Sequence, residues 1–233
     1  SSMTIRAVLF DKDGTLLDFN ATWMPMYRTF AGIVAHGDMG LTAELLRQGG
    51  QNDAKGIVAA GSLLAVASTG EIAALWASIA PNHGFDDLVL EMDAFFQRES
   101  VRAAVPVNGL SEILAGLKQR GLILGLATSD SEEGARASLT PFDVLQHFAY
   151  IAGYDSGHGI KPGPGMVNGF IAATDLRADE IMVVGDSGHD MAMGRRAGVG
   201  QCVGVLTGTS PRKILSELAD HVIDSIADLE SLL

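Results

Sequence analysis

The sequence predicts an α/β protein with a Rossmann-like, doubly wound parallel sheet and a smaller all-helical domain inserted after the first strand. Three observations support this prediction. Apolar runs without alternation, such as AVLF (7–10) and EIMVVG (180–185), are typical of strands covered on both faces. From residue 106 onward, helical and strand-like segments alternate. Between about residues 20 and 100, however, the pattern shows no clear strand.

The first part of the chain is expected to hold one strand followed by helices. The strand covers 4–10, and an amphipathic helix covers about 22–34, where Trp23, Met26, Phe30 and Val34 recur at helical spacing. Further helices are expected near 42–48, 53–67, 71–79 and 87–100. They open at the candidate N-caps Thr42, Asn52, Thr69 and Asp86.

The remaining chain is expected to complete the sheet. Strands are predicted within 122–130, 148–154, 180–185, 200–208 and 221–224. Helices are predicted within 106–121, 132–139 and 165–176, and after the strand that ends at Gly185. The expected domains are therefore a core formed by residues 1–17 plus 101–233 and an inserted helical domain at 18–100.

Composition excludes some classes of function. The 233 residues include 16 basic and 28 acidic side chains, a net charge of −12, which argues against a sequence-independent nucleic-acid binder. The most apolar stretch, 57–67, is shorter than the ~18 residues that a membrane-spanning helix needs. Cys202 is the single cysteine and is expected to be a small buried apolar residue. With no secretion signal in view, we expect a cytoplasmic protein with no membrane partner.

Polar residues follow the predicted strands at the edge where ligands bind in such sheets. They are Asp11 and Asp13 after the first strand, Thr128 and Ser129 after the next, Lys161 in the loop after the third, and Asp186 and Asp190 after the fourth. Crowded carboxylates repel unless a cation neutralises them, and carboxylate oxygens suit Mg²⁺. A lysine and a threonine nearby suit a phosphoryl group. Of Asp11 and Asp13, one can act as nucleophile and the other as proton carrier.

These residues resemble the motifs of the haloacid dehalogenase-type superfamily of Mg²⁺-dependent phosphohydrolases. DKDGT (11–15), Thr128 after LILGLA, Lys161 in IKPGPGM, and GDSGHD (185–190) match its four motifs in order. PVNGLSEILAGLKQRG (106–121) also resembles phosphoglycolate phosphatase-like members. The resemblance implies that residues 18–100 form a helical cap of the C1 type.

The resemblance also assigns roles to single residues. Asp11 is implied as the nucleophile, and Asp13 as the general acid/base and as a backbone-carbonyl ligand of Mg²⁺. Asp186 is implied to bind Mg²⁺ directly, whereas Asp190 binds through water or orients its neighbours. The implied metal set is Asp11, Asp13, Asp186 and Asp190. The implied phosphate-binding set is Thr128, Ser129, Lys161 and Gly14.

Two residues depart from the family pattern. Lys12 replaces the apolar residue that is commonest between the two acids. If the strand alternates, Lys12 points away from the site, and we expect a structural lysine that is solvated or snorkelled. His189 stands where Asn is frequent, and we expect a surface side chain. The plainer alternatives stay open too: Asp11 and Asp13 as a strand-end turn, and Asp186 and Asp190 as helix N-terminal acids.

Several functions fit these motifs. The leading prediction is a phosphatase of a small phosphorylated metabolite, with phosphoglycolate as the substrate that the resemblance suggests. A dehalogenase would not need Asp13, and a phosphonatase would need a cap lysine, for which Lys55 is the only candidate. A sugar phosphomutase and a non-enzymatic phospho-aspartate or binding protein remain alternatives. The pattern says nothing about oligomeric state.

Overall fold

The structure is a computed structural model that describes residues 4–52, 55–66, 69–81 and 83–233. The chain divides into two compact units: Ser1–Phe19 with Val105–Leu233, and Asn20–Ala104. The predicted boundaries, after residues 17 and 100, fall a few residues before these. Among the described residues, none of the helices combines the length and the apolar character that crossing a membrane requires.

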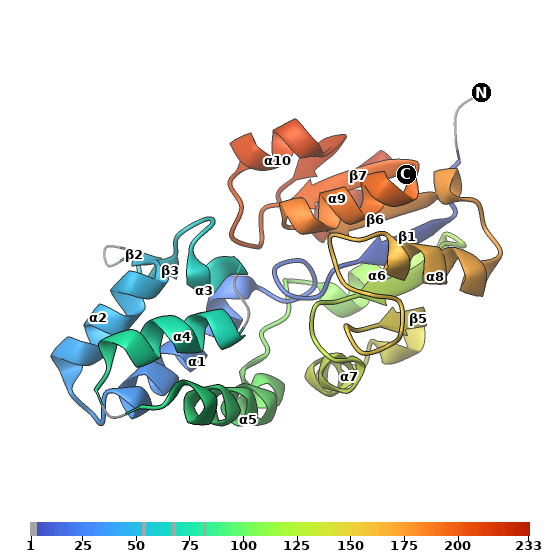
Figure 1. Ribbon diagram of the computed structural model, residues 1–233. Helices are drawn as coiled ribbons and strands as arrows, with labels where there is room; N and C mark the ends of the chain where they lie inside the picture. The colour runs from blue at the N-terminus through green and yellow to red at the C-terminus, as the bar shows by residue number, and fades with distance from the viewer. Residues whose placement is uncertain (1–3, 53–54, 67–68, 82) are drawn as a thin grey trace. The chain divides into compact units, whose positions relative to one another are not determined.

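The first unit is built on a parallel sheet. Its strands are β1 (Ala7–Phe10), β4 (Ile123–Ala127), β5 (Phe148–Ala152), β6 (Ile181–Gly185), β7 (Gln201–Val205) and β8 (His221–Ile223). They lie in the order β5-β4-β1-β6-β7-β8, and every pairing is parallel. The neighbouring strands β1, β6 and β7 are labelled in Figure 1. Phe10 pairs with Leu126 on one side and with Val184 on the other. The segment after β1 therefore leaves the sheet between those that follow β4 and β6.

Helices cover this sheet as the alternation of strands and helices predicts. They are α6 (Leu110–Gln119), α7 (Glu132–Leu139), α8 (Gly165–Thr174), α9 (Gly188–Ala197) and α10 (Arg212–Leu218), with 3₁₀ segments at Thr140–Phe142, Leu145–His147, Ala178–Glu180 and Ile226–Leu232. Phe170 of α8 and Met191 of α9 share one core cluster with Leu9 of β1. Val8 and Phe10 alternate with Leu9, lie outside that cluster and are equally buried. Both faces of β1 are thus covered, which explains its unbroken apolar run.

The second unit is mainly helical. Its helices are α1 (Phe19–Val34), α2 (Met39–Gly49), α3 (Leu63–Val66), α4 (Thr69–Ile79) and α5 (Phe85–Ala103). Phe30 of α1 packs against Trp76 of α4 and against Phe95 and Phe96 of α5, with ring centroids 5.1–6.4 Å apart. Trp76 is fully buried and its Nε1 donates a hydrogen bond to the Leu45 carbonyl. Aromatic packing of this kind explains the helical periodicity in the sequence.

The prediction that this unit is all-helical is wrong at one place. β2 (Gln51–Asn52) and β3 (Ile57–Val58) form a short antiparallel pair. The Asn52 carbonyl accepts the N–H groups of Lys55 and Gly56, and Gly56 has a φ of +64°, so this chain segment turns instead of continuing a helix. The helix predicted over 53–67 is reduced to α3; residues 53, 54 and 67 lie outside the described residues.

Two of the predicted helix starts also shift. The N-cap of α2 is Asp38, whose Oδ1 accepts the Leu41 N–H at 2.8 Å, so the helix begins earlier than Thr42. The N-cap of α5 is Gly84 and not Asp86, which lies within the first turn of the helix. Acidic side chains suit the N-cap, as at Asp38, and the first turn, as at Asp86, because the first turn leaves N–H groups without helical partners.

Candidate active site

Three carboxylates and one ammonium group meet beyond the carboxyl ends of the central strands. Asp11 follows β1, Asp186 follows β6, and Asp190 lies in the first turn of α9. Each offers an oxygen, and these oxygens all lie within 4.8 Å of one another. Lys161, from the loop between β5 and α8, donates to Asp11 Oδ1 and to Asp190 Oδ1, both at 2.7 Å. Segments distant in sequence thus converge because parallel strands end at one edge.

The charges of this group do not balance. Burial and the neighbouring Asp190 raise the pKa of Asp11 to about 6, although Lys161 acts in the opposite direction. Burial, together with Asp11 and Asp190, raises the pKa of Asp186 well above its ordinary value. Burial alone would lower the pKa of Lys161, but the two carboxylates it touches raise it. One ammonium among three carboxylates leaves excess negative charge, which a bound cation would neutralise.

The surroundings of Asp186 suit a small, oxygen-preferring cation. The atoms that could bind the cation are carboxylate oxygens, the ligands that Mg²⁺ favours. Backbone crowds the carboxylate closely: a Cβ added at Gly208 would lie 1.9 Å from Asp186 Oδ2, and one added at Gly14 would lie 2.2 Å from it. Thr207 Oγ1 also donates to the Gly14 carbonyl at 2.6 Å. The residues present therefore fit Mg²⁺, with Asp186 held in a narrow cradle of glycine backbone.

Thr207 and Gly208 were not predicted as part of the site. They follow β7, the strand next to β6, at the same end of the sheet as Asp186. The signal that could have found them is the run TGTSP (207–211) directly after an apolar strand, which repeats the strand-then-polar-loop pattern used for the other segments.

Asp190 has both carboxylate oxygens engaged by the protein. Its Oδ1 accepts from Lys161, and its Oδ2 accepts from the Asp186 N–H at 3.1 Å and from the Ser187 hydroxyl at 3.1 Å. With Ser187 it forms the capping box of α9. The structure is therefore consistent with both interpretations of Asp190. It is an acid at the N-terminus of α9, and it is a member of the site that orients Lys161.

The predicted phosphate-binding residues occupy different environments. Thr128 follows β4 and is buried, and its Oγ1 accepts the Asp130 N–H at 3.1 Å. Ser129 is exposed. Gly14 is buried and has a φ of +80°, a left-handed conformation that a side chain would strain. Thr128 and Gly14 thus belong to loops that leave adjacent strands, β4 and β1.

The expectation that Lys12 is solvated or snorkelled is wrong. Its side chain is 1% exposed, and its Nζ lies 3.0 Å from Asp130 Oδ2 and 3.2 Å from Asp13 Oδ2. Burial alone would lower the pKa of Lys12, but Asp13 and Asp130 raise it above its ordinary value, so the group stays charged. The Asp13 side chain lies outside the cluster of three carboxylates. His189 is exposed, as expected of a surface side chain.

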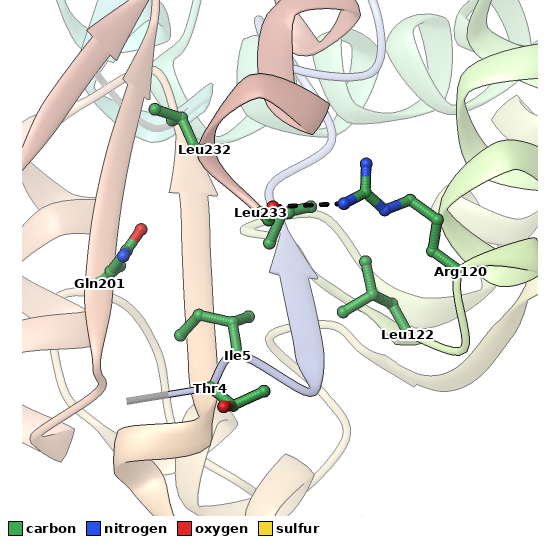
Figure 2. A pocket seen from close by; sticks show the side chains of 7 residues that line it. All are labelled: Thr4, Ile5, Arg120, Leu122, Gln201, Leu232 and Leu233. Carbon is green, nitrogen blue, oxygen red and sulfur yellow. Dashed lines mark hydrogen bonds between the residues drawn. The ribbon is translucent and has the colours of Figure 1, made fainter. Parts of the chain in front are cut away.

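A separate cavity lies at the opposite ends of the strands. It has a volume of about 300 Å³ and is lined by Thr4, Ile5, Arg120, Leu122, Gln201, Leu232 and Leu233 (Figure 2). Thr4 and Ile5 precede β1, Leu122 precedes β4, and Gln201 begins β7. Arg120 donates to the Leu233 carbonyl at 3.2 Å beside it. None of the acids described above lines this cavity.

Comparisons with known proteins agree with the geometry. The family model of the haloacid dehalogenase-like hydrolases matches residues 5–198. A phosphoglycolate phosphatase from Photorhabdus laumondii is 26% identical over 97% of this chain and 92% of its own. A phosphonoacetaldehyde hydrolase from Bacillus cereus is 28% identical over 96% and 84%. A predicted phosphoglycolate phosphatase from Haemophilus somnus has a similar fold, with a TM-score of 0.74, 20% identity and 99% of both chains covered.

Proposed function

The chain belongs to the haloacid dehalogenase-like hydrolases, and from this membership we propose that it is a Mg²⁺-dependent phosphatase working through an aspartyl-phosphate. The observation that carries the proposal is the contact of Lys161 with both Asp11 and Asp190 inside a group of three carboxylates. That arrangement offers a nucleophile, a fixed positive charge and an oxygen-rich place for a divalent cation.

In the first half of the reaction, an Asp11 oxygen attacks phosphorus. The new Asp11 O–P bond forms while the bond from phosphorus to the leaving oxygen breaks, and Asp13 gives that oxygen a proton. Lys161, already 2.7 Å from Asp11, offsets charge on the nucleophile and on the transferred group. The Thr128 hydroxyl donates to a phosphoryl oxygen.

In the second half, Asp13 takes a proton from water as the water oxygen attacks phosphorus. The Asp11 O–P bond breaks, which releases inorganic phosphate and restores the carboxylate. Asp11, Asp186 and the Asp13 carbonyl would hold Mg²⁺, with Asp190 acting through water. When bound, the cation supplies the positive charge that lets three carboxylates and a phosphate share one site.

For the substrate, we propose a small phosphorylated metabolite. Phosphoglycolate is the first candidate because a phosphoglycolate phosphatase is among the relatives that match over nearly the whole chain. The first unit supplies every group named in the reaction, so we assign substrate selection to the inserted unit, Asn20–Ala104. A screen of phosphorylated metabolites with Mg²⁺, including phosphoglycolate, sugar phosphates and nucleotides, identifies the preferred class.

The test of the chemistry is hydrolysis of p-nitrophenyl phosphate by the full chain. We expect activity with Mg²⁺, loss of activity with EDTA, and a loss of at least about 1,000-fold in Asp11→Asn. Asp143→Asn is a matched control, since Asp143 is an exposed aspartate of the same unit in a left-handed conformation that asparagine tolerates. Activity that survives in Asp11→Asn would refute the mechanism.

A phosphonatase is the second candidate, favoured by the similarity to a phosphonoacetaldehyde hydrolase. That activity would require an amine that forms a Schiff base with the substrate aldehyde. Lys55 is the one lysine of the inserted unit and is exposed. Phosphonoacetaldehyde cleavage that Lys55→Arg abolishes would support this candidate. Phosphate-ester hydrolysis that Lys55→Arg leaves intact supports the phosphatase.

A further inference from the structure

We propose that Lys12 is a positioning residue that holds the Asp13 carboxylate in place by tying it to Asp130. The inference rests on the proposed function, because it takes Asp13 as the group that protonates the leaving oxygen. Lys12 acts through Asp13 and belongs to neither the cluster of three carboxylates nor the predicted phosphate-binding set.

The proposal rests on one lysine that contacts two aspartates in the loops that follow two adjacent strands. Lys12 Nζ lies 3.2 Å from Asp13 Oδ2 and 3.0 Å from Asp130 Oδ2. The side chain of Lys12 is 1% exposed, whereas those of Asp13 and Asp130 are 24% and 33% exposed. Because β1 and β4 are parallel neighbours, the loops that follow them leave the sheet side by side. Lys12 bridges these two loops with one buried charge.

Asp130 is itself held in place by hydrogen bonds, so Lys12 can fix Asp13 by contacting both aspartates. Its Oδ1 accepts the Ser131 N–H at 2.7 Å, and its own N–H donates to Thr128 Oγ1 at 3.1 Å. Its carbonyl accepts the Tyr154 N–H at 2.9 Å from the loop after β5. With its backbone held at two points and its carboxylate at a third, Asp130 loses little further freedom when its Oδ2 accepts a hydrogen bond from Lys12.

Lys12 itself is held by its backbone as well as by its charge. The Lys12 carbonyl accepts the N–H groups of Thr15, Leu16 and Leu17 at 2.9–3.2 Å, which closes the turn that contains Asp13. A buried ammonium group is costly unless it is paired, so the two carboxylates are needed to keep it there. Loss of the Lys12 charge should therefore weaken the hold on the Asp13 carboxylate while the turn still forms.

The leaving group offers a readout that a purely structural role would not affect. A proton donor matters most when the leaving oxygen is a strong base and least when it is a weak one. p-Nitrophenolate leaves without a proton far more easily than p-methylphenolate does. If Lys12 positions Asp13, its loss must therefore slow p-methylphenyl phosphate much more than p-nitrophenyl phosphate.

The experiment compares kcat/KM for both substrates, with saturating Mg²⁺ and at one pH, in four variants of the full chain, because kcat/KM covers only the steps up to departure of the leaving group. We expect Lys12→Met to lose about 10-fold or more in kcat/KM on p-methylphenyl phosphate and under about 3-fold on p-nitrophenyl phosphate. Lys12→Arg keeps the charge and should restore most of the loss. Asp130→Asn removes the charge of the aspartate that holds Lys12 and should show the same selective loss. It should fold even if Lys12→Met does not.

Asp13→Asn separates the failure of this inference from failure of the proposed function. If Asp13→Asn shows the selective loss and folded Lys12→Met and Asp130→Asn do not, the positioning role is wrong and the phosphatase mechanism stands. If Asp13→Asn shows no selective loss, the proposed role of Asp13 fails first. An equal loss on both substrates in Lys12→Met and Asp130→Asn also overturns the positioning role.

Discussion

The first unit contains two buried lysines that each contact two carboxylates, and their surroundings differ. Lys161 contacts Asp11 and Asp190, whose side chains are 12% and 1% exposed, and Asp186 adds a third carboxylate, which is also buried. Lys12 contacts Asp13 and Asp130, which are partly exposed and screened by water. The first group therefore needs a further cation, whereas the second is complete without one. On our two proposals, similar ion pairs form a cation-binding site in one place and a positioning contact in the other.

The largest expected effect is the difference between removing these two lysines. In EDTA, Lys161→Met should lower the free energy of unfolding by about 3–5 kcal/mol, because three buried carboxylates then lack any counter-charge. Lys12→Met should cost only about 1–2 kcal/mol, since water reaches its partners. Saturating Mg²⁺ should reduce the difference in unfolding free energy between Lys161→Met and wild type. It should leave the difference between Lys12→Met and wild type unchanged.

Urea unfolding curves with EDTA and with Mg²⁺ measure both differences. The comparison is wrong if both substitutions lower the unfolding free energy equally and if Mg²⁺ does not change the effect of Lys161→Met. The two groups would then be electrostatically alike.

The next effect concerns the space around Asp186. Gly208→Ala should weaken Mg²⁺ binding by at least about 10-fold, because the new Cβ would lie 1.9 Å from Asp186 Oδ2 and the carboxylate must move. Gly32→Ala is the matched control: Gly32 lies in α1 and a Cβ there meets nothing within 4 Å. Titration of the Mg²⁺-induced rise in melting temperature measures both. If the Mg²⁺ concentration at the midpoint of this titration is unchanged in Gly208→Ala, the Asp186 carboxylate can move without loss of Mg²⁺ affinity.

The smallest effect comes from an exposed counterpart of the two buried groups. Arg195 lies 3.1 Å from Asp220, and both side chains are more than a third exposed, so Arg195→Gln should cost less than about 1 kcal/mol. Burial alone would raise the pKa of Asp220, but the Cys202 N–H and Arg195 lower it below its ordinary value. The lowered pKa stabilises the fold at neutral pH, and this contribution is lost as the pH falls below about 4.

Urea unfolding of wild type and Arg195→Gln at pH 7 and at pH 3 tests this sign. The small difference in unfolding free energy should shrink at the lower pH, and a difference that grows there would contradict the assignment.

Much of the core unit was predictable because its signals are local. Strands such as AVLF carry unbroken apolar runs, and the predicted helix at 132–139 coincides with α7. The carboxyl ends of those strands then placed Asp11, Asp186 and Lys161 at one edge. The short helix α10 (Arg212–Leu218) was missed, since seven residues with a single buried side chain, Leu215, give little periodicity.

The errors arose where tertiary contacts decide the outcome. We expected a solvated or snorkelled Lys12, but β1 ends at Phe10 and the chain turns, which buries the lysine between Asp13 and Asp130. The β2–β3 pair depends on a turn at Gly56 within a sequence that reads as apolar and helical. Asp130 is distant from Lys12 in the chain, and neither this contact nor the local turn at Gly56 leaves a periodic pattern, so a single sequence does not reveal them.

The glycine cradle around Asp186 has a consequence for how such an enzyme can change over time. At Gly14 and Gly208 the space for a side chain is already taken by the Asp186 carboxylate, and the left-handed φ of Gly14 adds a second restriction. Random substitution at these positions therefore has almost no tolerated outcome. New substrate preferences have to arise elsewhere in the chain, which leaves the phosphoryl-transfer groups as an inherited constant and the remaining surface as the part free to diverge.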